Sequence, residues 1–338
     1  MITAAKSTSD QYGFYGRLSS KFPSQVIVDV TEICNLSCTH CPHPDFRKSE
    51  HYGARMLDIA LNQKLIDEVR AHGADATQYV RYTSNGEPLV HPKIMEMLKY
   101  AKDHSGTTVT LTTNGKIMRE AQTEKLLDVG VDLIDISIDA LSPEVYAKIR
   151  VGGDLNVTGS NVRRLLKRKQ DTGSHMKVVV SYIEQPENLH ETKDFEKYWK
   201  DQGADYVVVR RLHSASGSKG AIAQDMWSKI DPKKRKPCVY PWERIVLNAK
   251  AQLAFCPADW SHGSSFIDYN QTTILETWNG DFYRELREAH LKNNYSCHKF
   301  CGQCPDWSVI RWPDEGRAYA DMVSELSRDG GQVTEKAV

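Results

Sequence analysis

The sequence predicts an α/β protein built around a parallel β-sheet, because runs rich in β-branched residues alternate with segments of helical periodicity. The chain has 338 residues, of which 40% are hydrophobic, and this is enough for one large core with a smaller appendage. Six runs have the composition and length of strands: 25–30, 79–83, 108–113, 133–138, 177–182 and 206–211. The pattern therefore predicts six β/α units.

The segments between these runs are long enough to carry the chain back across a sheet. Apolar residues at helical spacing predict helices over 57–72, 92–104, 157–170 and 188–201. A crossover helix between two strands makes those strands parallel. A doubly wound sheet and a barrel both satisfy this pattern, so the order of the elements does not choose between them.

Opposite charges balance in this chain: Lys plus Arg and Asp plus Glu both number 44, and the formal net charge is zero. Without a global basic field, we expect a small-molecule substrate and neither a nucleic acid nor a membrane partner. No stretch approaches the roughly 20 apolar residues that span a bilayer, and the N-terminus lacks a charged-then-apolar leader. We therefore expect a cytoplasmic protein.

The composition changes after a stretch of small residues at 214–224, which has the character of a linker. Six of the seven tryptophans and five of the eight cysteines lie beyond it. We therefore expect a second module with a different construction. The expected divisions are an N-terminal extension 1–24, a β/α region 25–213, a linker 214–226, a second module 227–317 and a C-terminal tail 318–338.

Three cysteines directly follow the first strand run with the spacing C-x3-C-x2-C: Cys34, Cys38 and Cys41. A cubane 4Fe–4S cluster needs a ligand on each iron, so three thiolates leave one iron free to hold a substrate or cofactor. The alternative is a structural zinc site, which usually presents C-x2-C pairs and completes a tetrahedron. Reduced thiolates bound to iron also fit a cytosolic setting better than disulfides do.

This spacing, in a loop after a first strand, resembles the radical S-adenosylmethionine (SAM) superfamily. The resemblance implies a partial (β/α)6 TIM barrel, with SAM chelated by the open iron of a cluster at the C-terminal end of the first strand. It therefore favours the barrel over the doubly wound sheet. Barrel enzymes in general place their chemistry on the loops at those strand ends.

The resemblance also implies SAM contacts at other strand ends. Gly86 and Glu87 match the family's Gly-Gly-Glu-Pro loop, which meets the SAM amine; outside the family this segment is a simple turn. Ser137, in a Ser-Ile-Asp segment, is expected to reach the SAM ribose or carboxylate. Arg150 is expected to pair with the carboxylate, the alternative being a solvated helix end. His40 stands where the family often has an aromatic residue beside the adenine.

Four cysteines of the second module have the spacing C-x17-C-x44-C-x2-C: Cys238, Cys256, Cys301 and Cys304. The first two flank a predicted hairpin over 244–255. The arrangement resembles the SPASM domain in its shortened twitch form, which holds one auxiliary 4Fe–4S cluster. The alternative is zinc, because four thiolates also suit a tetrahedral ion. The family's hairpin glycine is replaced by Ala251 here.

Cys297 is left over from both groups. In radical SAM epimerases a free thiol gives a hydrogen atom to the substrate radical, so the resemblance makes Cys297 a candidate for that catalytic role. The alternatives are a bystander thiol and a cluster ligand in place of Cys301 or Cys304. The spacing of the cysteines does not choose among these three roles.

The resemblance implies that the reduced three-cysteine cluster cleaves SAM to methionine and a 5'-deoxyadenosyl radical, which abstracts hydrogen from a substrate C–H bond. A flavodoxin or ferredoxin is the expected electron donor. The expected substrate is small and polar, similar to a sugar or aminocyclitol, and the expected outcome is oxidation (dehydrogenation) or epimerisation.

Two other functions stay open. A peptide-modifying SPASM maturase is disfavoured because only about 24 residues precede the first run, too few for a leader-peptide module. A non-enzymatic iron–sulfur electron carrier would need the cysteines but would have no use for the residues expected to contact SAM.

Overall fold

The computed structural model describes residues 11–83 and 85–327, and within them the strands form one nine-stranded sheet in the order β6-β5-β4-β3-β2-β1-β7-β8-β9. The first six strands are parallel, and each lies beside the strand before it in sequence. They are β1 (Gln25–Val28), β2 (Tyr79–Tyr82), β3 (Thr108–Thr113), β4 (Leu133–Ser137), β5 (Lys177–Glu184) and β6 (Tyr206–Arg211). This sequential order is that of a partial barrel and excludes the doubly wound alternative, whose strand order reverses.

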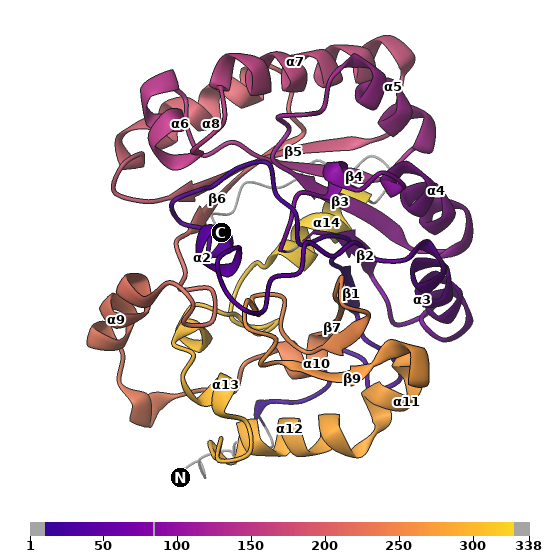
Figure 1. Ribbon diagram of the computed structural model, residues 1–338, viewed down its shortest axis with the longest axis vertical. Coiled ribbons are helices and arrows are strands. Elements are labelled where there is room, and N and C mark those ends of the chain that lie inside the picture. Colours follow the sequence, from indigo (N-terminus) through magenta and orange to yellow (C-terminus); the bar gives the residue numbers. More distant parts are fainter. Residues whose placement is uncertain (1–10, 84, 328–338) are drawn as a thin grey trace, which may run out of the picture.

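Helices cover the outer face of this sheet, and Figure 1 shows them as an arc around the strands. They are α3 (Ile59–His72), α4 (Ile94–His104), α5 (Glu120–Val129), α6 (Pro143–Ile149), α7 (Leu155–Thr172) and α8 (Thr192–Asp201). Aspartate caps begin two of them, because the side chains of Asp58 and Asp154 accept backbone N–H groups in the first turns of α3 and α7. None of the helices in the described ranges is long and apolar enough to cross a membrane.

The inner face of the sheet is covered by the C-terminal segment. Strand side chains alternate between the two faces, so Val80 packs under the outer helices while its neighbour Tyr79 belongs to a second cluster. That cluster includes Met322 and Val323 of α14 (Tyr319–Ser327), each 1% exposed. Figure 1 shows α14 among the strands of the barrel. One face of α14 is therefore part of the core, in contrast to the tail that we expected.

The second module extends the barrel sheet. β7 (Arg244–Leu247) pairs in parallel with β1, and β8 (Gln252–Ala254) and β9 (Ser265–Asp268) follow antiparallel. The hairpin predicted over 244–255 is therefore present. Its turn places Ala251 at φ +63°, in the left-handed region that favours glycine. Ala251 thus occupies a left-handed turn position with some backbone strain.

Short helices complete the second module: α9 (Gly220–Lys229), α10 (Tyr240–Glu243), α11 (Ile274–Asn279), α12 (Asp281–Leu291) and α13 (Lys299–Gly302). The described part of the N-terminal extension packs against this module. The ring of Tyr15 stacks on Trp312, with centroids 5.8 Å apart. The described N-terminal residues therefore contact the second module. The short helix α2 (His43–Phe46) follows the first cysteine loop.

The stretch that we expected to be a linker is packed structure. Ser214 is fully buried, and its N–H and hydroxyl donate to Asp306 Oδ1 over 2.9 and 2.6 Å. The N–H of Ser216 donates to the other oxygen of the same carboxylate at 2.7 Å. Small side chains resemble a linker in composition, but here a carboxylate distant in sequence fixes them.

Candidate active site

The first three cysteines lie on the loop that follows β1, and the backbone of this loop is tied to the end of α6. The N–H of Ser37 donates to the carbonyl of Val151 at 2.9 Å, and that of Thr39 to the carbonyl of Ile149 at 3.0 Å. The loop is therefore held over the C-terminal ends of the strands by main-chain contacts.

The three thiols are buried close to one another. Burial raises the pKa of Cys34 and of Cys41 to about 12, and the charge of Cys38 acts in the same direction on both. Such thiols keep their protons at neutral pH unless a metal replaces them. Two donors point at the sulfurs: His43 N–H lies 3.4 Å from Cys41 Sγ, and Arg150 Nη1 lies 3.6 Å from Cys38 Sγ. These side chains fit a 4Fe–4S cluster with three protein ligands.

Gly86 and Glu87 join this loop to the end of β3. A Cβ on Gly86 would lie 2.2 Å from the carbonyl oxygen of Thr31, so a side chain has no space there. The carboxylate of Glu87 accepts the hydroxyl of Thr113 at 2.6 Å and the N–H of Asn114 at 2.8 Å. In the described structure, Glu87 thus makes its hydrogen bonds within the protein, and contact with SAM stays a prediction.

Asp139 is the site residue to which we assigned no role from the sequence. Arg150 Nη2 lies 2.5 Å from Asp139 Oδ2, and His40 Nε2 lies 3.7 Å from the same oxygen. Asp139 is fully buried and has φ +63°, an uncommon value for a residue other than glycine. Asp139 is the aspartate of the Ser-Ile-Asp segment that ends two positions after Ser137, and this motif was the sequence signal that could have identified it as a site residue.

The electrostatics of this group follow from burial. Burial lowers the pKa of His40 to about 4, so the imidazole is neutral at physiological pH. The charge of Arg150 is paired with Asp139, while Ser137 is half-buried at the end of β4. Contacts of His40, Ser137 and Arg150 with SAM remain predictions.

The four cysteines of the second module lie within electrostatic reach of one another. Burial is the main cause of a raised pKa at each, and the charge of Cys304 acts on both Cys238 and Cys256. Arg235 donates to the carbonyl of Cys301 at 2.7 Å. Within the described ranges, no three His, Cys, Asp or Glu side chains are close enough to hold a single metal ion. Four thiols are the number that completes a 4Fe–4S cluster.

Cys297 differs from that group in its exposure to solvent. It is exposed in the turn between α12 and α13, whereas the other seven cysteines are buried or half-buried. Its sulfur lies 3.9 Å from the hydroxyl of Ser296. The role of hydrogen-atom donor stays a prediction, and this exposed position gives it no support.

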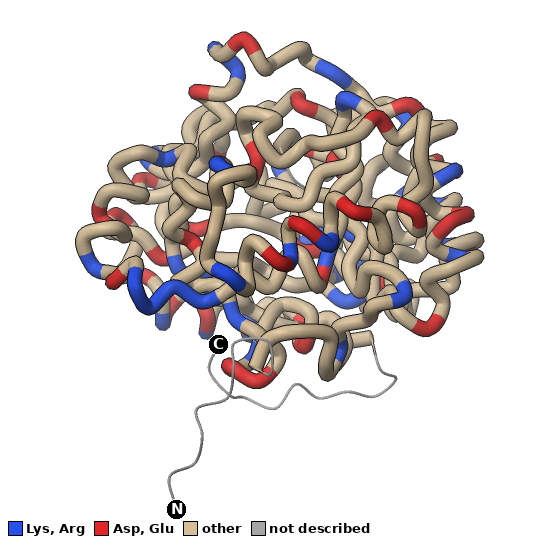
Figure 2. Tube along the Cα trace, turned by 90° about the horizontal axis from the view of Figure 1, so that it is seen from below, with Lys and Arg blue, Asp and Glu red and all other residues tan. Residues whose placement is uncertain are grey.

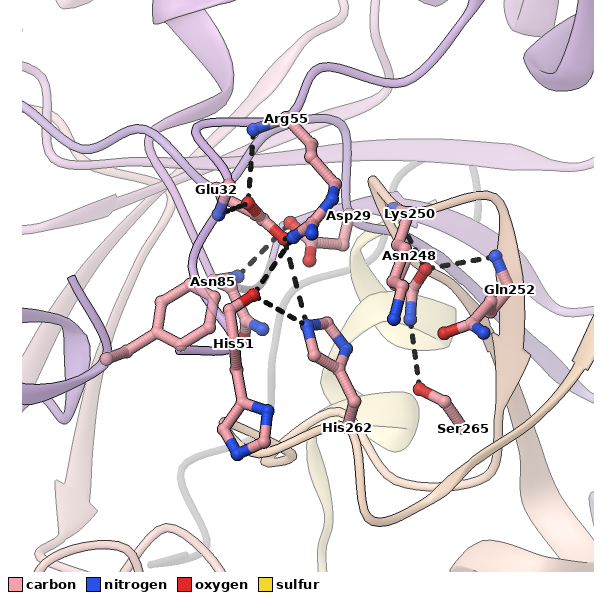
Figure 3. A network of polar contacts seen from close by, with 12 residues as sticks. Asp29, Glu32, His51, Arg55, Asn85, Asn248, Lys250, Gln252, His262 and Ser265 are labelled. Atoms are coloured by element: carbon pink, nitrogen blue, oxygen red, sulfur yellow. Dashed lines mark hydrogen bonds and ion pairs between the residues drawn. The ribbon is translucent and has the colours of Figure 1, made fainter. Parts of the chain in front are cut away.

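A polar network links the two cysteine-bearing modules (Figure 3). Asn85, which replaces the first glycine of the family loop, donates its N–H to Asp29 Oδ1 at 3.3 Å and its side-chain amide to the carbonyl of Asp259 at 3.1 Å. Glu32, two residues before the first cysteine, lies 3.8 Å from Nε2 of His262. The departure from glycine therefore adds a contact between the modules.

Comparison with known families agrees with this geometry. The model of the radical SAM superfamily matches residues 28–195, and that of the iron–sulfur cluster-binding SPASM domain matches residues 238–305. The chain belongs to the radical SAM superfamily. A 4Fe–4S cluster and SAM are the cofactors of the radical SAM domain, and the SPASM domain adds an auxiliary iron–sulfur site.

Curated relatives of this radical SAM protein match a little over half of the chain. The tungsten-containing aldehyde ferredoxin oxidoreductase cofactor-modifying protein of Pyrococcus furiosus is 27% identical over 187 residues, which is 55% of this chain and 50% of the relative. The GTP 3',8-cyclase of Alkaliphilus metalliredigens is 31% identical over 194 residues, 56% of this chain and 57% of the relative. The chain thus spans about half the length of the curated relatives that it matches.

Solved structures show the same fold over most of the radical SAM chain. BtrN in complex with AdoMet and 2-DOIA is 15% identical with a TM-score of 0.56, covering 84% of this chain and 93% of BtrN. Streptococcus suis SuiB bound to the precursor peptide SuiA is 12% identical with a TM-score of 0.62, covering 92% of this chain and 76% of SuiB. At these identities the likeness concerns the fold alone.

Proposed function

We propose that this protein cleaves SAM reductively and removes a hydrogen atom from a C–H bond of a small polar substrate. The observation that carries the proposal is the unequal size of the two cysteine groups, three after β1 and four in the second module. Three thiolates leave an iron open for SAM, whereas four complete a cluster. When bound, these cofactors supply a 5'-deoxyadenosyl radical and an electron acceptor close to it.

The chain's own residues then orient the cofactor and exclude water. Arg150 places a buried positive charge beside Cys38, and Asp139 fixes the direction of its guanidinium. The close approach of Gly86 to the carbonyl of Thr31 holds the loop after β2 against the loop after β1. Burial of these groups removes water from a site where a reactive radical would otherwise be lost.

Oxidation of the substrate is the outcome that we favour over epimerisation. Removal of a hydrogen atom takes one electron from the substrate, and oxidation requires an acceptor for the second electron, which the substrate radical gives up together with a proton. The four-cysteine group is suited to the role of electron acceptor. Epimerisation needs a thiol beside the substrate, and the exposed Cys297 is poorly placed for that.

Two substrate classes compete for the site. A small sugar-like or aminocyclitol-like molecule follows from the sequence resemblance, and BtrN, of similar fold, is known with 2-DOIA bound. A peptide is the second candidate, because SuiB has a similar fold and binds the precursor peptide SuiA. Transfer of deuterium from a labelled aminocyclitol or a labelled peptide into 5'-deoxyadenosine would separate the two.

Reductive SAM cleavage tests the proposal. Anaerobically reconstituted protein, treated with dithionite and SAM, should form 5'-deoxyadenosine, measured by mass spectrometry. Cys34→Ala should reduce the product to background, and Cys297→Ala should not, because this thiol lies outside both groups. A wild-type protein with both clusters that forms no 5'-deoxyadenosine would refute the proposal.

A further inference from the structure

A cavity of about 600 Å³ lies between the edge strand β6, the first residues of β1 and β7, and the segment that precedes α14. Its volume is that of a typical small-molecule site. Among the described residues, eight Lys and Arg side chains line it, against three carboxylates. Because the whole chain has a net charge of zero, this excess of positive charge is local.

Most of these cations are neutralised by partners. Six of the eight pair with carboxylates; fully buried Asp135, for example, lies 3.3 Å from Arg81 and 2.7 Å from Arg210. In residues 11–83 and 85–327, Arg211 and Arg311 have no carboxylate partner. Arg311 only donates to the carbonyl of Arg317, at 3.3 Å. Two guanidinium groups are therefore available to an anion in the cavity.

The cavity also adjoins the second cysteine group. Ser216 lines it, and its hydroxyl lies 3.3 Å from Cys256 Sγ. A molecule bound in the cavity would thus lie beside the candidate auxiliary cluster.

A basic segment leads to the rim of the cavity. Residues 233–236 are all Lys or Arg and form the longest unbroken blue stretch in Figure 2. Lys233 and Lys234 are exposed, whereas Lys236 lines the cavity. Charges of one sign at the mouth of a cavity raise the local concentration of an oppositely charged ligand.

We propose that this cavity binds a phosphate group of the substrate through Arg211 and Arg311. Guanidinium groups bind phosphate oxygens in a bidentate manner, and two of them that line the same cavity without carboxylate partners suit a phosphorylated ligand. The inference rests on the proposed function, because it names the chemical class of the molecule on which the radical acts. The substrate is then a phosphorylated small molecule in place of a neutral one.

Inorganic pyrophosphate is the probe. Titration calorimetry on the protein with both clusters reconstituted should detect binding, and Arg211→Gln or Arg311→Gln should each weaken it about tenfold, as expected for a charge-assisted contact. Arg211→Lys keeps the charge and should recover part of the affinity. Lys125→Gln is the matched control, because this exposed lysine on α5 lies away from the cavity and its basic segment, and its loss should leave the affinity unchanged.

Three results would overturn the inference: unchanged affinity in the Arg211→Gln, Arg311→Gln double variant, an equal loss in Lys125→Gln, or tighter binding of citrate than of pyrophosphate. SAM cleavage without added substrate is measured on the same samples. Cleavage without pyrophosphate binding would reject the inference and leave the proposed function standing. Pyrophosphate binding without SAM cleavage would reject the proposed function instead.

Discussion

At the scale of single residues, close contacts around the first cysteine loop decide which side chains are tolerated. Gly86 was found from a motif, but its physical reason is the carbonyl of Thr31, which a Cβ would approach to 2.2 Å. The pairing of Arg150 with Asp139 was not predictable, because it joins a strand end and a helix end that meet only in the fold. Motifs in the sequence thus pointed to the loops of the candidate site, but they did not predict which of its side chains contact one another.

Gly86→Ala should destabilise the protein by about 3 kcal/mol, because backbone atoms and not a flexible side chain oppose the added carbon. Gly220→Ala is the matched control, since a Cβ there meets no atom within 4 Å. Urea unfolding of both variants measures the difference. Equal stabilities would show that the loop approach seen at Gly86 is not required.

Asp29→Asn should gain stability relative to the wild type as the pH rises from about 4 to 7. Burial raises the pKa of this carboxyl well above its ordinary value. A folded pKa above the unfolded one gives stability that is complete below about pH 4 and is lost as the pH rises toward the folded pKa. Asparagine does not ionise and escapes this loss. Thermal unfolding of both proteins across this pH range checks the prediction, and parallel curves would contradict it.

At the scale of elements, local sequence patterns predicted the strands and crossover helices. They did not predict the segments whose structure depends on residues distant in sequence. The six parallel strands fall within two residues of their expected ends, because alternation and β-branched composition are local signals. Residues 214–226 were expected to be a linker because the carboxylate that holds Ser214 and Ser216 is about 90 positions away. α14 was expected to be a tail because its partners are strands of the barrel.

Asp306→Ala should cost about 2–3 kcal/mol, because it leaves the buried N–H and hydroxyl of Ser214 and the N–H of Ser216 without an acceptor. Asp225→Ala, which removes an exposed carboxylate on α9, is the control and should change stability by less than about 0.5 kcal/mol. Hydrogen exchange at Ser214 and Ser216 locates the effect. Retained protection of both amides in Asp306→Ala would contradict the assignment.

At the scale of the whole molecule, the two modules share one sheet, and α14 packs against the inner face of the barrel strands. β7 pairs with β1. The hairpin that carries part of the second cysteine group therefore lies beside the strand that leads into the first cysteine group. The Asn85 network adds a side-chain link between the same two regions. This arrangement keeps two redox sites in a fixed relation, as an oxidation of the proposed kind requires.

Val323→Asp should destabilise the barrel by about 4 kcal/mol, because it buries a charge in the cluster formed by α14 and the inner strand face. Ser327→Asp, at an exposed position of the same helix, should have little effect. Denaturant unfolding followed by circular dichroism compares the two. A mild effect at Val323 would indicate that α14 is not part of the barrel core.

Iron and acid-labile sulfide per chain, measured after anaerobic reconstitution, test the claim of two clusters most directly. We expect about eight irons in the wild type, about eight in Cys297→Ala, and about four in Cys301→Ala, which removes a proposed ligand of the auxiliary cluster. About four irons in the wild type would contradict the second cluster. A fall to about four in Cys297→Ala would instead make this exposed thiol a ligand and contradict the assignment of the other four cysteines.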